Sequence, residues 1–87
     1  MPAAVVLRFS NTSSDDVLVV LEPWATEVVL GAGSAVDVVS SGMDGVMEVE
    51  HADGRVLLYG WPGAVLHLAS NGTELSSGAI VRREGAG

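Results

Sequence analysis

The sequence predicts an all-β protein, and two observations lead to that prediction. Short runs rich in Val and Leu recur between residues 5 and 81, and Gly, Pro, Asn-Gly or Asp-Gly signals interrupt them about every 8 to 12 residues. The longer runs without Gly or Pro alternate with a period of two, so no segment is typical of a helix. We therefore expect a small antiparallel β-sandwich of about eight short strands, with a partly closed β-barrel as the alternative.

The first half of the chain contains four expected strands, at residues 4–10, 17–21, 26–30 and 35–40. In the first of them Val5, Leu7 and Phe9 share one face because side chains alternate along a strand. The strand at 17–21 is apolar on both faces, which is typical of a central strand or of one with a face at an interface. Pro23 ends the pairing because it has no N–H to donate.

The second half contains the remaining expected strands, at residues 46–51, 55–59, 64–69, 73–75 and 79–82. Asp53-Gly54 is the strongest turn signal in the chain and predicts a hairpin with a positive φ angle between its neighbours. Asn71-Gly72 predicts a second tight turn. The strand at 46–51 alternates clearly, with Glu48 and Glu50 directed to water.

Length and composition are typical of one small domain over residues 1–87, with a frayed tail at 83–87. Hydrophobic residues make up 48% of the chain, which is more than so small an interior can bury. We therefore expect part of the apolar surface to be covered by a second copy of the chain.

The net charge of −7, with four Arg and no Lys, argues against nucleic acid and membrane surfaces as partners, because phosphate groups would be repelled. The chain has no Cys, which excludes disulfides and thiolate chemistry and fits a reducing cytoplasm. The polar run at 11–15 predicts a loop, and the glycosylation-like triplets at Asn11 and Asn71 are interpreted as turns.

Two corners rich in Trp and Pro are the strongest candidates for contact with a partner. Residues 19–24 and 57–62 resemble each other, and each segment carries one Trp and one Pro at the end of an apolar strand. The two corners then form an apolar ledge at one end of the molecule, or else each Trp plugs an open end of the core. The candidate contact residues are Trp24, Trp61, Pro23 and Glu22, with Tyr59 and Leu57 as candidates on a strand face.

Catalytic, cofactor and metal signatures are not found in the sequence. His51 and His67 are the only histidines, and they form neither an H-x-H pair nor an H-E-x-x-H motif. Gly31 and Gly33 lack the helix and the G-K-[ST] sequence of a phosphate loop. We predict no catalytic, cofactor or metal residues, and a metal-dependent enzyme stays a remote alternative that requires the two histidines to meet.

The N-terminal half carries Asn11-Thr12, a strand that ends in Leu-Glu-Pro-Trp at residues 21–24, and Gly33. With these features, this part of the chain resembles a group of short, mostly uncharacterised bacterial all-β proteins. Ala25 stands where that group usually has Gly, and Ala32-Gly33 replaces its Pro-Gly turn. The resemblance implies an independent small bacterial β protein and no particular activity.

These observations favour a cytoplasmic, non-enzymatic interaction or assembly module that self-associates as a homodimer or larger oligomer, with another protein as a further partner. The alternative is a module that binds a carbohydrate or another small ligand, because an exposed Trp beside a carboxylate suits the face of a sugar. In that case Trp24 or Trp61 is exposed, with Glu22 or Glu27 within hydrogen-bonding distance of the ligand.

Overall fold

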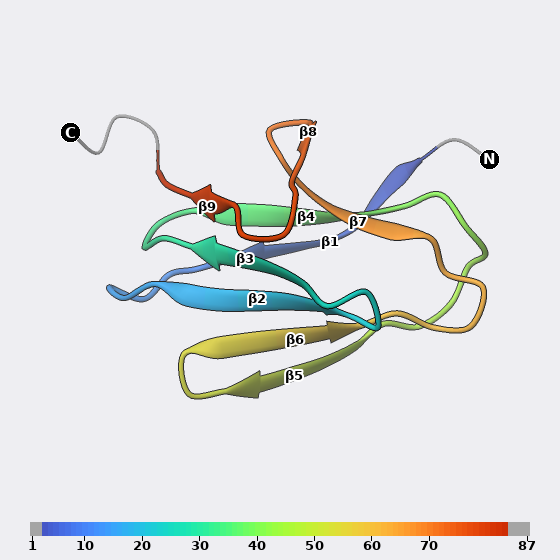
Figure 1. Cartoon of the computed structure of the whole chain (residues 1–87), viewed down its shortest axis with the longest axis horizontal. Coiled ribbons are helices and arrows are strands. Elements are labelled where there is room, and N and C mark those ends of the chain that lie inside the picture. Colours follow the sequence, from blue (N-terminus) through green and yellow to red (C-terminus); the bar gives the residue numbers. More distant parts are fainter. Residues whose placement is uncertain (1–2, 84–87) are drawn as a thin grey trace.

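Two β-sheets form the regular structure of the protein in a computed structural model that describes residues 3–83. The sheets stack around a shared apolar core and do not close into a barrel (Figure 1). Apart from Arg83, the predicted frayed tail lies outside the described residues. The strands are β1 (Ala4–Ser10), β2 (Val17–Glu22), β3 (Thr26–Leu30), β4 (Ala35–Ser40), β5 (Glu48–Ala52), β6 (Arg55–Tyr59), β7 (Leu66–Ser70), β8 (Thr73–Glu74) and β9 (Ile80–Val81).

The strand order confirms the predicted sandwich and refines its pairing. One sheet has the order β1-β4-β7-β8, and the other has the order β5-β6-β2-β3-β9. Two pairings, β2 with β6 and β3 with β9, are parallel, and the other pairings are antiparallel. Strands β2 and β6 are not joined by a hairpin, because the chain passes through β4 of the other sheet between them. A crossover of this kind allows the two strands to run in the same direction.

Both predicted tight turns occur. Asp53-Gly54 joins β5 to β6, with Ala52 opposite Arg55, and only Gly54 of this turn has a positive φ, of 70°. Asn71-Gly72 joins β7 to β8, and both of its residues have positive φ, of 50° and 80°. The second turn therefore has the doubly left-handed backbone that Asn-Gly favours between twisted strands.

Three strands begin later than the sequence predicted, and β9 does so by a single residue, at Ile80 instead of residue 79. Strand β5 starts at Glu48 instead of residue 46, because Val46 precedes the ladder with β6 and is almost fully exposed. Strand β7 starts at Leu66 instead of residue 64, because the Ala64 N–H donates to the Trp61 carbonyl at 2.9 Å and closes a turn.

The core lies between the sheets and consists almost entirely of Val and Leu side chains. Strand β2 is central in its sheet and places Val17, Val19 and Leu21 in this core, while Leu18 and Val20 point to the other face. The pattern of apolar residues on both faces of this strand therefore indicates a central position, as predicted. It also places apolar side chains on the outer surface of the sheet. The buried core residues are Val17, Val19, Leu21, Val28, Leu30, Val36, Val38, Val56, Leu58, Leu66, Leu68 and Val81.

Candidate interaction surfaces

The two Trp corners lie at the same end of the molecule. Strand β2 runs parallel to β6 with Glu22 opposite Tyr59, so the turns that follow these strands are neighbours (Figure 1). The Gly60 N–H donates to the Glu22 carbonyl at 2.8 Å and extends the ladder by one residue. The two similar segments of the sequence are thus brought side by side, but their Trp side chains have different surroundings.

Trp24 is a surface residue. It is 44% exposed and follows the cis Glu22-Pro23 peptide bond, and Pro23 is also exposed. Its indole ring lies over the backbone of Gly60, at a place where any Cβ atom would collide with the ring. Trp24 therefore forms part of an exposed ledge and does not plug the core.

Trp61 plugs an open end of the core, which is the second of the two roles that the sequence allowed for the Trp residues. Its ring is half-buried, packs against the core and lies directly on Gly45, where there is no room for a side chain. Its Nε1–H donates to the Met43 carbonyl at 2.7 Å, so the polar atom of the indole is satisfied. Trp61 therefore fills the end of the sandwich, and only part of its edge is open to a partner.

The outer surface of the five-stranded sheet, which we call the five-stranded face, carries an apolar patch. The strand register places Leu18 beside Val29, and Val29 beside Ile80. Val20 lies between Glu27 and Leu57 and is only 7% exposed, although it is not part of the core. No element of the described chain lies over this patch, whose apolar members are Leu18, Val20, Val29, Leu57 and Ile80.

Carboxylates and one tyrosine border the apolar patch. Glu22, Tyr59 and Glu48 form one row across β2, β6 and β5. The Tyr59 hydroxyl donates to Glu50 Oε1 at 3.0 Å, and this hydrogen bond is the main reason why the pKa of Tyr59 is raised. Burial and the negative charges of Glu50, Glu22 and Glu48 raise the pKa further, which shows how acidic this part of the surface is.

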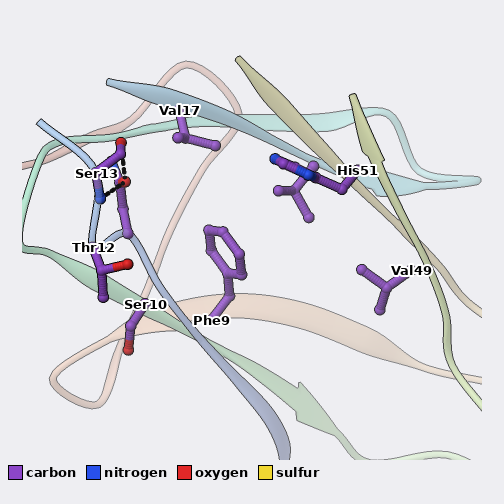
Figure 2. A pocket seen from close by; sticks show the side chains of 9 residues that line it. Phe9, Ser10, Thr12, Ser13, Val17, Val49 and His51 are labelled. Atoms are coloured by element: carbon purple, nitrogen blue, oxygen red, sulfur yellow. Dashed lines mark hydrogen bonds between the residues drawn. The ribbon is translucent and has the colours of Figure 1, made fainter. Parts of the chain in front are cut away.

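A groove separates β1 from β5 on one side of the sandwich, which we call the open side. It has a volume of about 340 Å³ and is lined by Phe9, Val49 and His51 together with the hydroxyl residues of the 10–13 turn. Figure 2 shows the Phe9 ring between the two sheets, with Val49 and His51 directed toward it from β5. A smaller hollow of about 110 Å³ continues the same side and is lined by residues that include Val6, Met47 and Trp61.

The four sheet edges differ in length and charge. Strands β8 and β9 have two residues each, and β5 carries Glu48 and Glu50. Strand β1 has seven residues and one charged side chain, Arg8, which is bound to Asp37 through hydrogen bonds of 2.6 and 3.1 Å. The hydrogen bond from Arg8 holds the pKa of the Asp37 carboxyl below its ordinary value, so the pair stays ionised and mutually neutralised near neutral pH.

The two histidines are far apart in the fold. His51 lies on β5 at the groove, whereas His67 lies on β7 and is directed to the outer surface of the other sheet. Within residues 3–83 no three side chains among His, Asp and Glu gather in a way that could hold a metal ion. Likewise, no helix of the described residues is long and apolar enough to cross a membrane.

Comparisons with protein-family models, with curated proteins and with solved structures gave no match for this chain. Its surfaces are therefore interpreted from their own geometry. Sequence reasoning missed Val29 and Ile80 as members of the five-stranded face, and it missed the free edge of β1. The apolar character of residues 17–21 was the available signal for an apolar outer face. It did not identify the strands beside β2, because those strands are set by non-local pairing.

Proposed function

We propose that this protein is a non-enzymatic interaction module that self-associates by pairing the free edge of β1 with the same edge of a second copy. The observation that supports this proposal is the contrast among the edges of the described chain. A long edge strand with unpaired N–H and C=O groups is a template for another strand unless charge, shortness or a β-bulge protects it. Strand β1 is the longest edge strand of the described chain, lacks an unpaired charge and is regular over residues 7–10, beyond its bulge.

The other edges are protected against pairing with themselves. Two β5 strands paired about a two-fold axis at Val49 would place Glu48 opposite Glu50 of the other copy, and like charges directly opposite destabilise a ladder. Strands β8 and β9 are too short to offer a useful ladder. Strand β1 has a β-bulge between Val5 and Leu7, so the regular stretch for pairing is residues 7–10. The prediction that Val5 shares a face with Leu7 and Phe9 is wrong for this reason: the extra residue turns Val5 outward, while Leu7 and Phe9 pack against the core.

Apolar surface next to β1 favours the same arrangement. The open side exposes parts of Val6, Phe9, Met47 and Val49, and half-buried Trp61 lies at its end. A second copy seated along β1 would take some of this surface out of water, at about 25 cal/mol for each Å² of apolar area. The absence of Cys and the resemblance to bacterial proteins favour a bacterial cytoplasm as the location of this assembly.

Sedimentation equilibrium over a concentration series tests the proposal. Val6→Glu places a charge at the bulge of β1, directly before the regular stretch 7–10 and on the open side that a second copy would cover. Val6 is 49% exposed, so the fold tolerates the charge while the buried surface of a dimer does not. The matched control is Val65→Glu, because Val65 is 56% exposed and lies on the far side of β4 from β1. We expect Val6→Glu to weaken association by at least roughly tenfold, since a two-fold dimer contains the new charge twice. Equal effects of the two variants would contradict the role of β1.

A second candidate function is the binding of a carbohydrate at the exposed ledge. The specific observation in its favour is the 44% exposure of Trp24 next to the carboxylate of Glu22. A sugar stacked on this indole would change its fluorescence, and the change would disappear in Trp24→Leu. A panel of sugars that leaves the emission unchanged would exclude this candidate.

A further inference from the structure

We infer that the five-stranded face binds a second protein whose contact surface combines apolar side chains with Lys or Arg. This inference goes beyond self-association, because it concerns the outer surface of one sheet and not the free edge of the other. Three observations lead to it: an apolar patch that the chain leaves uncovered, a border of carboxylates without basic partners, and an exposed indole at one end.

The apolar patch is built like the inner face of a sandwich but has no second layer. Leu18, Val29 and Leu57 come from three adjacent strands and are half-buried by one another, and Ile80 at the edge is largely exposed. Clustered apolar side chains on a sheet are a common mark of an interaction site. The patch therefore offers the apolar centre that stable protein interfaces require.

The carboxylates at the border lack basic partners on this surface. Glu22, Glu27, Glu48 and Glu50 all lie on strands of this sheet. In the described part of the chain the ion pairs are Arg8 with Asp37 and Arg82 with Asp16, and neither involves these four glutamates.

Arg55 is the basic residue on the ladder of this face, opposite Leu18 at the other end of the patch. The potential over the patch is thus strongly negative on the side of Tyr59, and it complements a cationic partner.

A second copy of the chain is a poor occupant of this face. Two such faces in contact would bring eight carboxylates to a shared border, in a chain that already carries a net charge of −7. Phosphate groups of nucleic acids or lipids would be repelled in the same way. The charge pattern therefore selects a protein partner with basic side chains around an apolar centre.

Trp24 offers a cation-binding surface at the end of the five-stranded face where Glu22 and Tyr59 lie. It lies two residues after Glu22 in the chain, and its ring lies over Gly60, the residue after Tyr59. A Lys or Arg side chain that reaches Glu22 can also lie against the exposed indole, an arrangement that binds cations more tightly than a carboxylate alone. Indole fluorescence thus offers a local reporter of binding.

Isothermal titration calorimetry with synthetic peptides tests the inference. The probes are an acetylated octapeptide of alternating Leu and Lys and its counterpart of alternating Leu and Glu, which has the same apolar pattern and the opposite charge. We expect the Leu-Lys peptide to bind, with affinity that falls as salt is added, and the Leu-Glu peptide not to bind. Equal binding of both peptides, or no binding of the Leu-Lys peptide at low salt, would overturn the inference.

Two double variants separate this face from the overall acidity of the chain. Glu22→Gln with Glu27→Gln removes two charges from the border, and Asp15→Asn with Glu74→Gln removes two charges from exposed residues elsewhere. We expect roughly fivefold weaker binding of the Leu-Lys peptide in the first double variant and no change in the second, as two surface ion pairs are lost only in the first. An equal loss in both would assign binding to net charge and overturn the inference.

The self-association variant keeps the two proposals distinguishable. Val6→Glu lies away from the five-stranded face, so we expect it to bind the Leu-Lys peptide as the wild type does. If the wild type proves monomeric and still binds the peptide, self-association fails and the inference about the five-stranded face stands.

Discussion

Asn11 is the polar residue on which the connection between β1 and β2 is built. It is only 3% exposed, and its Nδ2 donates to the carbonyls of Asp15 at 2.8 Å and Leu30 at 3.0 Å. Its Oδ1 accepts hydrogen bonds from the backbone N–H and the hydroxyl of Ser13. The predicted loop of residues that bond their own backbone is therefore correct, and the additional bond to Leu30 ties it to the other sheet.

Replacing this side chain should destabilise the protein strongly. Asn11→Ala removes all four hydrogen bonds of this buried side chain, including the one to the Leu30 carbonyl, so we expect a loss of about 2–3 kcal/mol in the free energy of unfolding. Urea denaturation measures this loss. Thr12→Ala, at the exposed next residue, should stay within about 0.5 kcal/mol of the wild type. Similar losses in the two variants would contradict the role assigned to Asn11.

Ala25 has a backbone conformation that suits glycine. Its φ of 58° lies in the left-handed region, where a Cβ atom is strained. We expect Ala25→Gly to raise the free energy of unfolding by roughly 0.5–1 kcal/mol. Ala52→Gly on β5, where φ is not positive, should lower it instead. A loss of stability in Ala25→Gly of the same size as in Ala52→Gly would contradict this account.

Strand β2 shows how one element serves two surfaces. Because its side chains alternate, Val19 and Leu21 contribute to the core while Leu18 and Val20 contribute to the five-stranded face. Neighbouring strands add charge at fixed positions, since the register alone places each glutamate beside an apolar residue or Tyr59. The chemistry of the face is therefore a property of the pairing of five strands and not of any one segment.

The titration of Tyr59, the only tyrosine, reports this pairing directly. Its hydroxyl reaches Glu50, the diagonal neighbour on β5, so its ionisation should have a midpoint above the ordinary value of 10.0 in a spectrophotometric titration. The raised pKa means that this contact stabilises the fold below pH 10 and that the contribution is lost as pH rises through the pKa of the folded state.

The variant Glu50→Gln replaces the carboxylate that accepts the Tyr59 hydrogen bond, the largest cause of this shift, and also removes its charge. We expect it to move the Tyr59 midpoint back toward the ordinary value, while Glu74→Gln on β8 leaves the midpoint unchanged. A midpoint that does not respond to Glu50→Gln would mean that β5 and β6 do not pair in the register described.

Local signals account for most of what the sequence predicted correctly. The hairpins at Asp53-Gly54 and Asn71-Gly72 depend on turn residues next to each other in the chain, and their positions were correctly predicted. The parallel pairing of β2 with β6 depends on how the chain crosses between sheets, and no local pattern encodes it. Trp24 and Trp61 had similar sequence surroundings, and only the tertiary contacts with Gly60 and Gly45 separate the exposed residue from the packed one.

At the scale of the whole molecule, the distribution of charge assigns different partners to the edge of β1 and to the five-stranded face. Copies of a chain with a net charge of −7 repel one another, so they meet most easily where charge is neutralised, along β1 with its Arg8–Asp37 pair. The acidic five-stranded face is left for a cationic protein. Added salt should therefore strengthen self-association and weaken binding of the Leu-Lys peptide, because screening reduces both the repulsion and the attraction.

Sedimentation equilibrium of the wild type beside Val6→Glu and Val65→Glu distinguishes self-association through β1 from a general effect of added charge, because the two variants add the same charge to residues of similar exposure. We expect a reversible oligomer for the wild type and for Val65→Glu, and a shift toward monomer for Val6→Glu alone. A wild type that remains monomeric at high micromolar concentration and in added salt would contradict self-association through β1.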